Sequence, residues 1–172
     1  MKISIRAICL MALVAAVYAA VTISQAAIGF GPIQFRVAES LNLLAFFNPI
    51  FAPAVALGVL ITNIASPYGV IDMVFGTLAT IIALLAIRAT KKTTNNLLVA
   101  SFWPTIVNAA IIPLVILIPG VGLAGLTWGA YLGIAATVAL GQFVVVTLFG
   151  YTFFRFMMAR NKNFIETIEN LR

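Results

Sequence analysis

The sequence has 172 residues, of which 63% are hydrophobic and 8% are charged. The apolar residues form long runs, which excludes a soluble globular domain and predicts a multi-pass protein of the cell membrane. A net charge of +6 would favour a nucleic acid partner in a soluble protein. Here the basic residues lie in small groups beside apolar runs, where they set membrane topology. We therefore expect a lipid bilayer around the chain, no nucleic acid partner, and one domain over residues 1–172.

The lack of histidine and the single cysteine limit the chemistry of the chain. It has no histidine, and its one cysteine, Cys9, lies inside the first apolar run. This excludes disulfides, most zinc sites and histidine-based catalysis. We therefore expect no metal, no cofactor and no enzymatic activity.

Six apolar runs predict an all-α fold, an integral membrane bundle of six transmembrane helices. In chain order the runs are Ala7 to Ala27, Val37 to Phe47, Ile50 to Ala65, Val70 to Ala89, Leu97 to Ile118 and Leu126 to Phe156. The second run is too short to cross a bilayer, so we expect a half-length helix packed inside the bundle. Asn48-Pro49 ends it, because proline lacks a backbone donor and disfavours helix in the residue before it.

Three basic groups indicate the orientation of the bundle. Lys2 and Arg6 precede the first run, residues 88–92 follow the fourth, and residues 155–162 follow the last. With all three groups inside, an even number of spans places both termini in the cytoplasm. Residues 161–172 are expected to extend the last helix into the cytoplasm. In the alternative, the first run is a cleaved signal peptide and five spans remain, which satisfies the same charge rule.

The first predicted helix carries small residues at helical spacing. Ala12, Ala16 and Ala20 follow one another at intervals of four, with Ala15 and Ala19 beside them. Small residues at this spacing let two helices approach closely in a membrane. The pattern predicts either packing within the bundle or a docking face for a partner.

Three charged residues lie within the apolar frame, apart from the flanking groups and the tail: Arg36, Glu39 and Asp72. Ionisable groups at membrane depth cost free energy and generally mark a functional site. On the predicted topology all three lie toward the outer face, because Arg36 and Glu39 open the second helix and Asp72 lies in the first turn of the fourth. The alternative for Arg36 and Asp72 is a position in the headgroup region, at a helix end.

Amide side chains complete a predicted pocket that is open to the outside. Asn42 follows Arg36 and Glu39 at helical spacing, and Asn63 ends the third helix. Asn108 and Gln142 lie deeper, where they could form a floor or simply hydrogen-bond other helices.

The loop of residues 29–35, which contains Gln34, is rich in glycine and proline and lies over this pocket. We expect it to be a lid or an ordinary connection.

Two carboxylates and several amides favour a ligand with many hydrogen-bond donors and a positive charge. One carboxylate can accept two parallel N–H bonds from an amidine-like edge, as in a guanine-type base, and the other can bind an ammonium group. An anionic ligand would be repelled, because Arg36 offsets only one of the two negative charges.

Two long segments resemble the QueT family. They are GPIQFRVAESLNLL at residues 31–44, followed by FNP at residues 47–49, and IDMVFGTLAT at residues 71–80. Weaker resemblances are WPTIVN at residues 103–108 and GQFVVV at residues 141–146. At the position of Gln142 we expect a glutamate, so the chain departs from the family pattern there.

The resemblance implies a substrate-binding S-component of an energy-coupling factor (ECF) transporter. Such a protein captures a 7-deazaguanine precursor of queuosine outside the cell. It then docks through an alanine motif, matched here by Ala12 and Ala16, onto a transmembrane T-component driven by two cytoplasmic ATPase subunits. This chain has no glycine-rich phosphate loop ending in Lys-Ser or Lys-Thr, so the ATPase chemistry would belong to the partners.

A second hypothesis is a stand-alone proton-coupled carrier for a small cationic or nucleobase-like solute, in which Glu39 or Asp72 binds the proton. A purely structural membrane protein would not explain charges gathered on one side of the bundle. An intramembrane enzyme would need an activated nucleophile or a metal cluster beside the carboxylates.

Overall fold

The computed structural model describes residues 4–30, 34–117 and 127–171, and within these ranges every regular element is a helix. In chain order they are α1 (Ile5–Ser24), α2 (Ala26–Gly29), the 3₁₀ helix η1 (Val37–Leu43), α3 (Leu44–Phe47), α4 (Phe51–Ile64), α5 (Gly69–Thr93), α6 (Leu97–Leu117), α7 (Trp128–Gln142), the π-helix η2 (Phe143–Gly150), α8 (Tyr151–Arg160) and α9 (Lys162–Glu169). The predicted all-α class is confirmed.

Four helical segments among the described residues are long and apolar enough to cross a membrane: α1, α5, α6 and the continuous helix α7–η2–α8. The second predicted helix is short, as expected, with η1 and α3 together covering Val37–Phe47. The third is also short, since α4 has 14 residues. The turns at Asn48-Pro49 and Ser66-Pro67 limit its length. The predicted ends Ile118 and Leu126, and the turn between them, lie outside the described residues.

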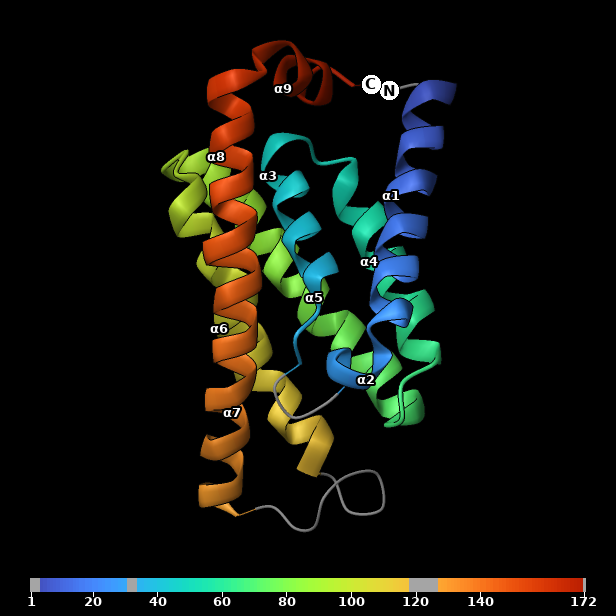
Figure 1. Ribbon diagram of the computed structural model, residues 1–172, viewed down its shortest axis with the longest axis vertical. Coiled ribbons are helices and arrows are strands. Elements are labelled where there is room, and N and C mark those ends of the chain that lie inside the picture. The colour runs from blue at the N-terminus through green and yellow to red at the C-terminus, as the bar shows by residue number, and fades with distance from the viewer. Residues whose placement is uncertain (1–3, 31–33, 118–126, 172) are drawn as a thin grey trace.

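The short helix η1–α3 lies in the interior of the bundle (Figure 1). Helix α1 packs against α4, α4 against α5, and α5 against α6. The helix η1 contacts α1, α4, α6 and η2. Most side chains of η1 and all four of α3 are buried. A half-length helix must be packed inside protein, because its ends cannot reach both membrane surfaces.

Gly58 brings α1 and α4 into close contact. A Cβ atom added there would lie 2.8 Å from Tyr18 Cβ and 3.0 Å from the main-chain oxygen of Ala15. The face of α1 that carries Ala15 and Ala19 is therefore used for packing within the bundle. Three other alanines, Ala12, Ala16 and Ala20, are exposed on α1.

The C-terminal tail does not extend the last helix, and that expectation is wrong. Asn161 breaks the helix with φ −133° and ψ 68°, and α9 lies across the end of the bundle at which α1 begins (Figure 1). Ile165 and Ile168 pack into the core. The side-chain Nδ2 of Asn48 donates to the carbonyl oxygens of Ile168 at 2.9 Å and Leu171 at 3.0 Å. An apolar stripe on a polar helix explains why α9 turns back onto the protein.

Candidate functional site

Glu39 is held by two neutral donors in the interior of the bundle. Glu39 is only 2% exposed. The hydroxyl of Tyr18 in α1 donates to Oε1 at 2.8 Å, and Nδ2 of Asn42 donates to Oε2 at 2.6 Å. Residues three apart eclipse one another in a 3₁₀ helix, so η1 brings Glu39 and Asn42 together directly. Each carboxylate oxygen keeps a further lone pair for another donor.

Asp72 has a separate set of partners at the start of α5. The Ser66 hydroxyl donates to its Oδ2 at 2.6 Å, and Nη2 of Arg36 lies 3.7 Å from the same oxygen. Asn63 in α4 donates through Nδ2 to the main-chain oxygen of Asp72 at 3.2 Å. The N-terminal end of α5 further favours a negative charge at this position.

Arg36 joins three segments of the chain. It lies just before η1 in extended conformation, so its side chain reaches toward α4 and α5. Nε donates to the carbonyl oxygen of Gly29 at 2.8 Å, and Nη1 donates to Oδ1 of Asn63 at 3.3 Å. The guanidinium also stacks 4.6 Å from the ring centroid of Phe30. Arg36 therefore fixes the end of α2 against the cluster around Asp72.

The charges of the two clusters do not balance. Arg36 pairs with Asp72, whereas Glu39 forms no ion pair with any residue that the structure describes. An unpaired carboxylate in a dry interior is costly unless a positive group joins it. The two carboxylates and one guanidinium leave a net charge of −1, which suits a ligand of charge +1.

Several buried polar atoms beside these clusters have no hydrogen-bond partner among the described residues. They include Asp72 Oδ1, Asn42 Oδ1, Gln34 Nε2, Gln142 Oε1 and Arg36 Nη2, which is only within ion-pair range of Asp72. Buried polar atoms in folded proteins are nearly always satisfied, so such a group marks a place where a polar ligand can bind.

The comparisons with known proteins identify the family. The family model described as QueT transporter matches residues 8–159. The chain belongs to the QueT transporter family. Its family and its four long apolar helices agree with the multi-pass membrane protein that the composition predicted.

One curated relative, the queuosine precursor transporter QueT of Lactococcus lactis subsp. cremoris (strain MG1363), is 43% identical to this chain over 76 residues. That alignment covers 43% of this chain and 44% of the relative, so it spans less than half of the relative's length. No solved structure matches the chain.

The structure groups some of the predicted site residues of this QueT-family chain and leaves others apart. Glu39 is hydrogen-bonded to Asn42, and Arg36 connects Asn63 and Asp72. All eight predicted residues are buried: Gln34, Arg36, Glu39, Asn42, Asn63, Asp72, Asn108 and Gln142. Gln34, Asn108 and Gln142 form no hydrogen bond to another member of this set within the described ranges.

The predicted lid is described in part. Residues 31–33 lie outside the described residues, and the remainder borders the cluster around Arg36. Tyr68 Oη donates to the main-chain oxygen of Phe30 at 3.4 Å. Burial, followed by the nearby carboxylate of Asp72, raises the pKa of Tyr68, against an opposing effect of Arg36. Its phenol stays neutral and remains a donor to the loop at physiological pH.

Sequence reasoning missed Tyr18, Ser66 and Gly76. Tyr18 and Ser66 supply hydroxyl donors to the two carboxylates. A Cβ atom on Gly76 would lie 2.5 Å from Asp72 Oδ1 and 2.8 Å from Asn63 Nδ2, so only glycine fits there without displacing them. The available signal was spacing, since Gly76 follows Asp72 by one helical turn.

Proposed function

We propose that this chain is the membrane-embedded, substrate-binding subunit of an ECF-type ABC importer. It captures a queuosine precursor, a 7-deazaguanine base such as 7-aminomethyl-7-deazaguanine, from outside the cell. It then delivers this base by docking on a T-component that two cytoplasmic ATPase subunits drive. The substrate class is supported by the relative from Lactococcus lactis, which is named as a queuosine precursor transporter.

The observation that carries this proposal is the buried Glu39, which has neutral donors and no cationic partner in the described structure. The edge of a guanine-type base presents two parallel N–H donors, and one carboxylate can accept both. Glu39 would bind this edge, while the unpaired Oδ1 of Asp72 would accept from the aminomethyl ammonium group. A ligand of charge +1 would then neutralise the site.

The amides around the carboxylates would complete recognition of the base. Asn42 Oδ1 and Gln142 Oε1 are unpaired acceptors, and Gln34 Nε2 is an unpaired donor. A purine-like ring has both donors and acceptors on its edges, so both kinds of atom can be used. Asn63 and Arg36 would act by holding Asp72 in place.

The alanine stripe of α1 supports the docking part of the proposal. Ala12, Ala16 and Ala20 are exposed, while the packing of α1 on α4 uses a different face. A partner helix can approach closely along such a stripe. Because α1 also contributes Tyr18 to the site, we propose that α1 is retained and not cleaved.

The rival proton-coupled carrier rests on the same buried Glu39, since a carboxylate without a cationic partner can exchange a proton during transport. The two functions differ in what drives uptake. A carrier would respond to a proton gradient without partner subunits, whereas the importer subunit would need them and ATP.

The binding proposal is tested by titrating the purified chain with 7-aminomethyl-7-deazaguanine in an isothermal calorimeter. Glu39→Gln should weaken binding by about 100-fold, because hydrogen bonds to a charged group contribute about 1.5–3 kcal/mol. Glu166→Gln, an exposed change on α9, is the matched control and should bind normally. Unchanged affinity of Glu39→Gln would remove Glu39 from the site.

A further inference from the structure

A polar cavity lies at the other end of the bundle from the carboxylates. Its volume is about 600 Å³, and it is an open cavity bordered by the connection between α5 and α6, by α8 and by α9. Its lining includes Lys91, Asn95, Asn96, Tyr151, Arg155 and Glu169. Because Asp72 opens α5 and Lys91 lies in the last turn of that helix, the length of α5 separates the two sites.

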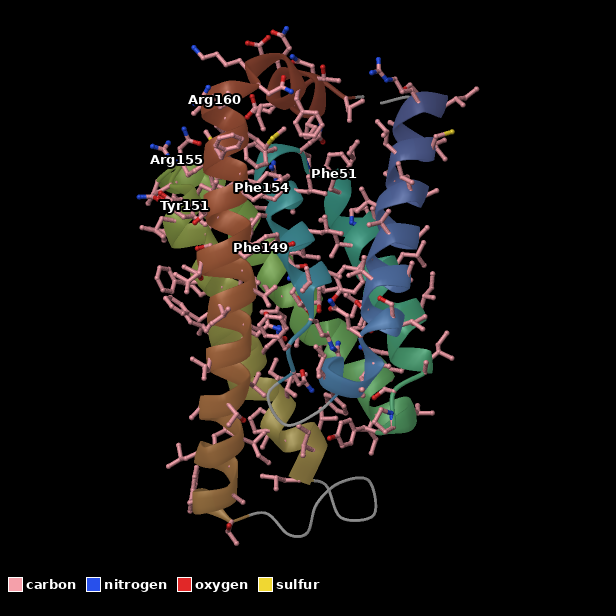
Figure 2. The ribbon with its side chains drawn as sticks, in the orientation of Figure 1. Phe51, Phe149, Tyr151, Phe154, Arg155 and Arg160 are labelled. Atoms are coloured by element: carbon pink, nitrogen blue, oxygen red, sulfur yellow. The ribbon has the colours of Figure 1, made fainter. Side chains whose placement is uncertain are left out.

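Of the two basic residues that the structure describes in this cavity, Lys91 is paired with a carboxylate and Arg155 is not. Lys91 Nζ lies 3.3 Å from Glu169 Oε1 and 4.7 Å from the ring centroid of Phe46. Arg155 is exposed and forms no hydrogen bond or ion pair with any residue in the described ranges. Figure 2 shows Arg155 and Tyr151 on the same side of α8. The cavity therefore has a net charge of +1 and a free guanidinium, a group that binds phosphate oxygens in pairs.

An apolar seam leads from the cavity toward the middle of the bundle. Leu98 lines the cavity, and Phe102 follows it one helical turn later on α6; each is 39% exposed. The ring of Phe102 packs against that of Phe143 in η2, with 6.0 Å between the two centroids. Exposed apolar side chains next to a basic cavity suit a molecule with an anionic head and a hydrocarbon chain.

We propose that this cavity binds the phosphodiester headgroup of an anionic phospholipid, with an acyl chain along the seam between α6 and η2. A single negative charge on the phosphodiester matches the net charge of the cavity. The basic residues gathered at this end of the chain mark the level of lipid headgroups. An acidic segment of a partner protein would match the charge but would not use the seam.

The test is a thermal-shift titration of the purified chain in neutral detergent. Phosphatidylglycerol should raise the melting temperature to a plateau, whereas phosphatidylcholine with the same chains should not. Glycerol 3-phosphate, which has the phosphate but no chains, should have no effect at the same concentration. An equal shift with glycerol 3-phosphate would overturn the lipid assignment in favour of a soluble anion.

Variants of α8 test the position of the site. Arg155→Gln should weaken the phosphatidylglycerol titration about fivefold, the effect of one basic residue near a lipid surface. Arg155→Lys keeps the charge but not the paired donors, so it should weaken the titration less than Arg155→Gln. Arg160→Gln is the matched control, because Arg160 lies on the same helix, outside the cavity, near Phe156. Equal weakening by both glutamine variants would mean diffuse attraction and no site. Displacement of the lipid by an acidic peptide would assign the cavity to a protein partner instead.

Discussion

Glu39 and Asp72 are both buried carboxylates, but their neighbours give them different properties. Asp72 has a guanidinium, a hydroxyl and a helix N-terminus around it. Glu39 has only a phenol and an amide. The hydrogen-bond donors of a ligand therefore stabilise Glu39 more than Asp72, because Asp72 is already compensated by Arg36.

Replacing Tyr18 by phenylalanine tests whether α1 takes part in the site. The change removes the hydroxyl that donates to Glu39 but keeps the ring that packs on Gly58. We expect calorimetric titration with the deazaguanine base to show about fivefold weaker binding, the effect of one lost hydrogen bond. Tyr131→Phe, which removes a hydroxyl bonded at 2.9 Å to the carbonyl oxygen of Ala110, is the control. Equal affinities of the two variants would contradict a role for Tyr18.

Gly76→Ala tests the geometry around Asp72. The added methyl group would displace Asp72 Oδ1 and the Asn63 amide, and overpacking of this kind costs about 1–3 kcal/mol. We expect a lower melting temperature and a ligand affinity reduced about tenfold. Gly133→Ala in α7 adds a methyl group with nothing within 4 Å and should leave both quantities unchanged. Wild-type affinity in Gly76→Ala would place the ligand away from Asp72.

At the scale of whole elements, sequence length and pattern predicted the short interior helix but not its backbone. The run Val37 to Phe47 was too short to span, and its burial follows from that. The 3₁₀ geometry of η1 and the π-helical geometry of η2 depend on how these two segments pack against each other. A Cβ atom on Gly150 would lie 3.1 Å from Ser40 Cβ. A contact between residues so far apart in the chain leaves no local sequence signal.

The sequence of the C-terminal tail, residues 161–172, contains the pattern of an amphipathic helix, but its polar composition obscured that pattern. Ile165, Ile168 and Leu171 recur every three residues, which is typical of an amphipathic helix. The surrounding charged and polar residues favoured a solvated extension. Capping of the end of α9 by Asn48, which is distant in sequence, adds to the packing of this stripe and has no local sequence signal.

Asn48→Ala should loosen α9 from the bundle. Its amide donates to three carbonyl oxygens at the end of α9, those of Ile168, Glu169 and Leu171. Leaving such groups unsatisfied costs about 1–3 kcal/mol, so the melting temperature should fall. Asn163→Ala, an exposed change on α9 itself, should have no effect. Equal melting temperatures of the two variants would contradict the capping role.

Bulky residues on the exposed stripe of α1 test docking. Ala12→Leu and Ala16→Leu should prevent co-purification with the T-component and ATPases, because a close helix contact has no room for them. The same variants should bind the base normally, since the stripe does not belong to the face that packs on α4. Ala136→Leu, at an exposed position in α7, should assemble normally. Loss of ligand binding together with assembly would indicate misfolding and contradict this account of the stripe.

At the scale of the molecule, the polar site and the basic groups lie at different ends of the bundle. Asp72 opens α5, and Lys91 and Lys92 close it. The positive-inside rule predicts that the end with the basic groups faces the cytoplasm and that the site faces the outside. This arrangement suits capture of an external solute. Composition and charge were enough to predict that the polar site and the basic groups lie at different ends, because both act over whole helices, whereas the pairing of Arg36 with Asp72 required the packed structure.

Uptake in proteoliposomes tests the central claim most directly. The chain is reconstituted alone or with the T-component and ATPases, and entry of labelled 7-aminomethyl-7-deazaguanine is measured with and without ATP and a proton gradient. We expect uptake only when the partner subunits and ATP are both present. Uptake by the chain alone under a proton gradient would contradict the importer subunit and favour the carrier.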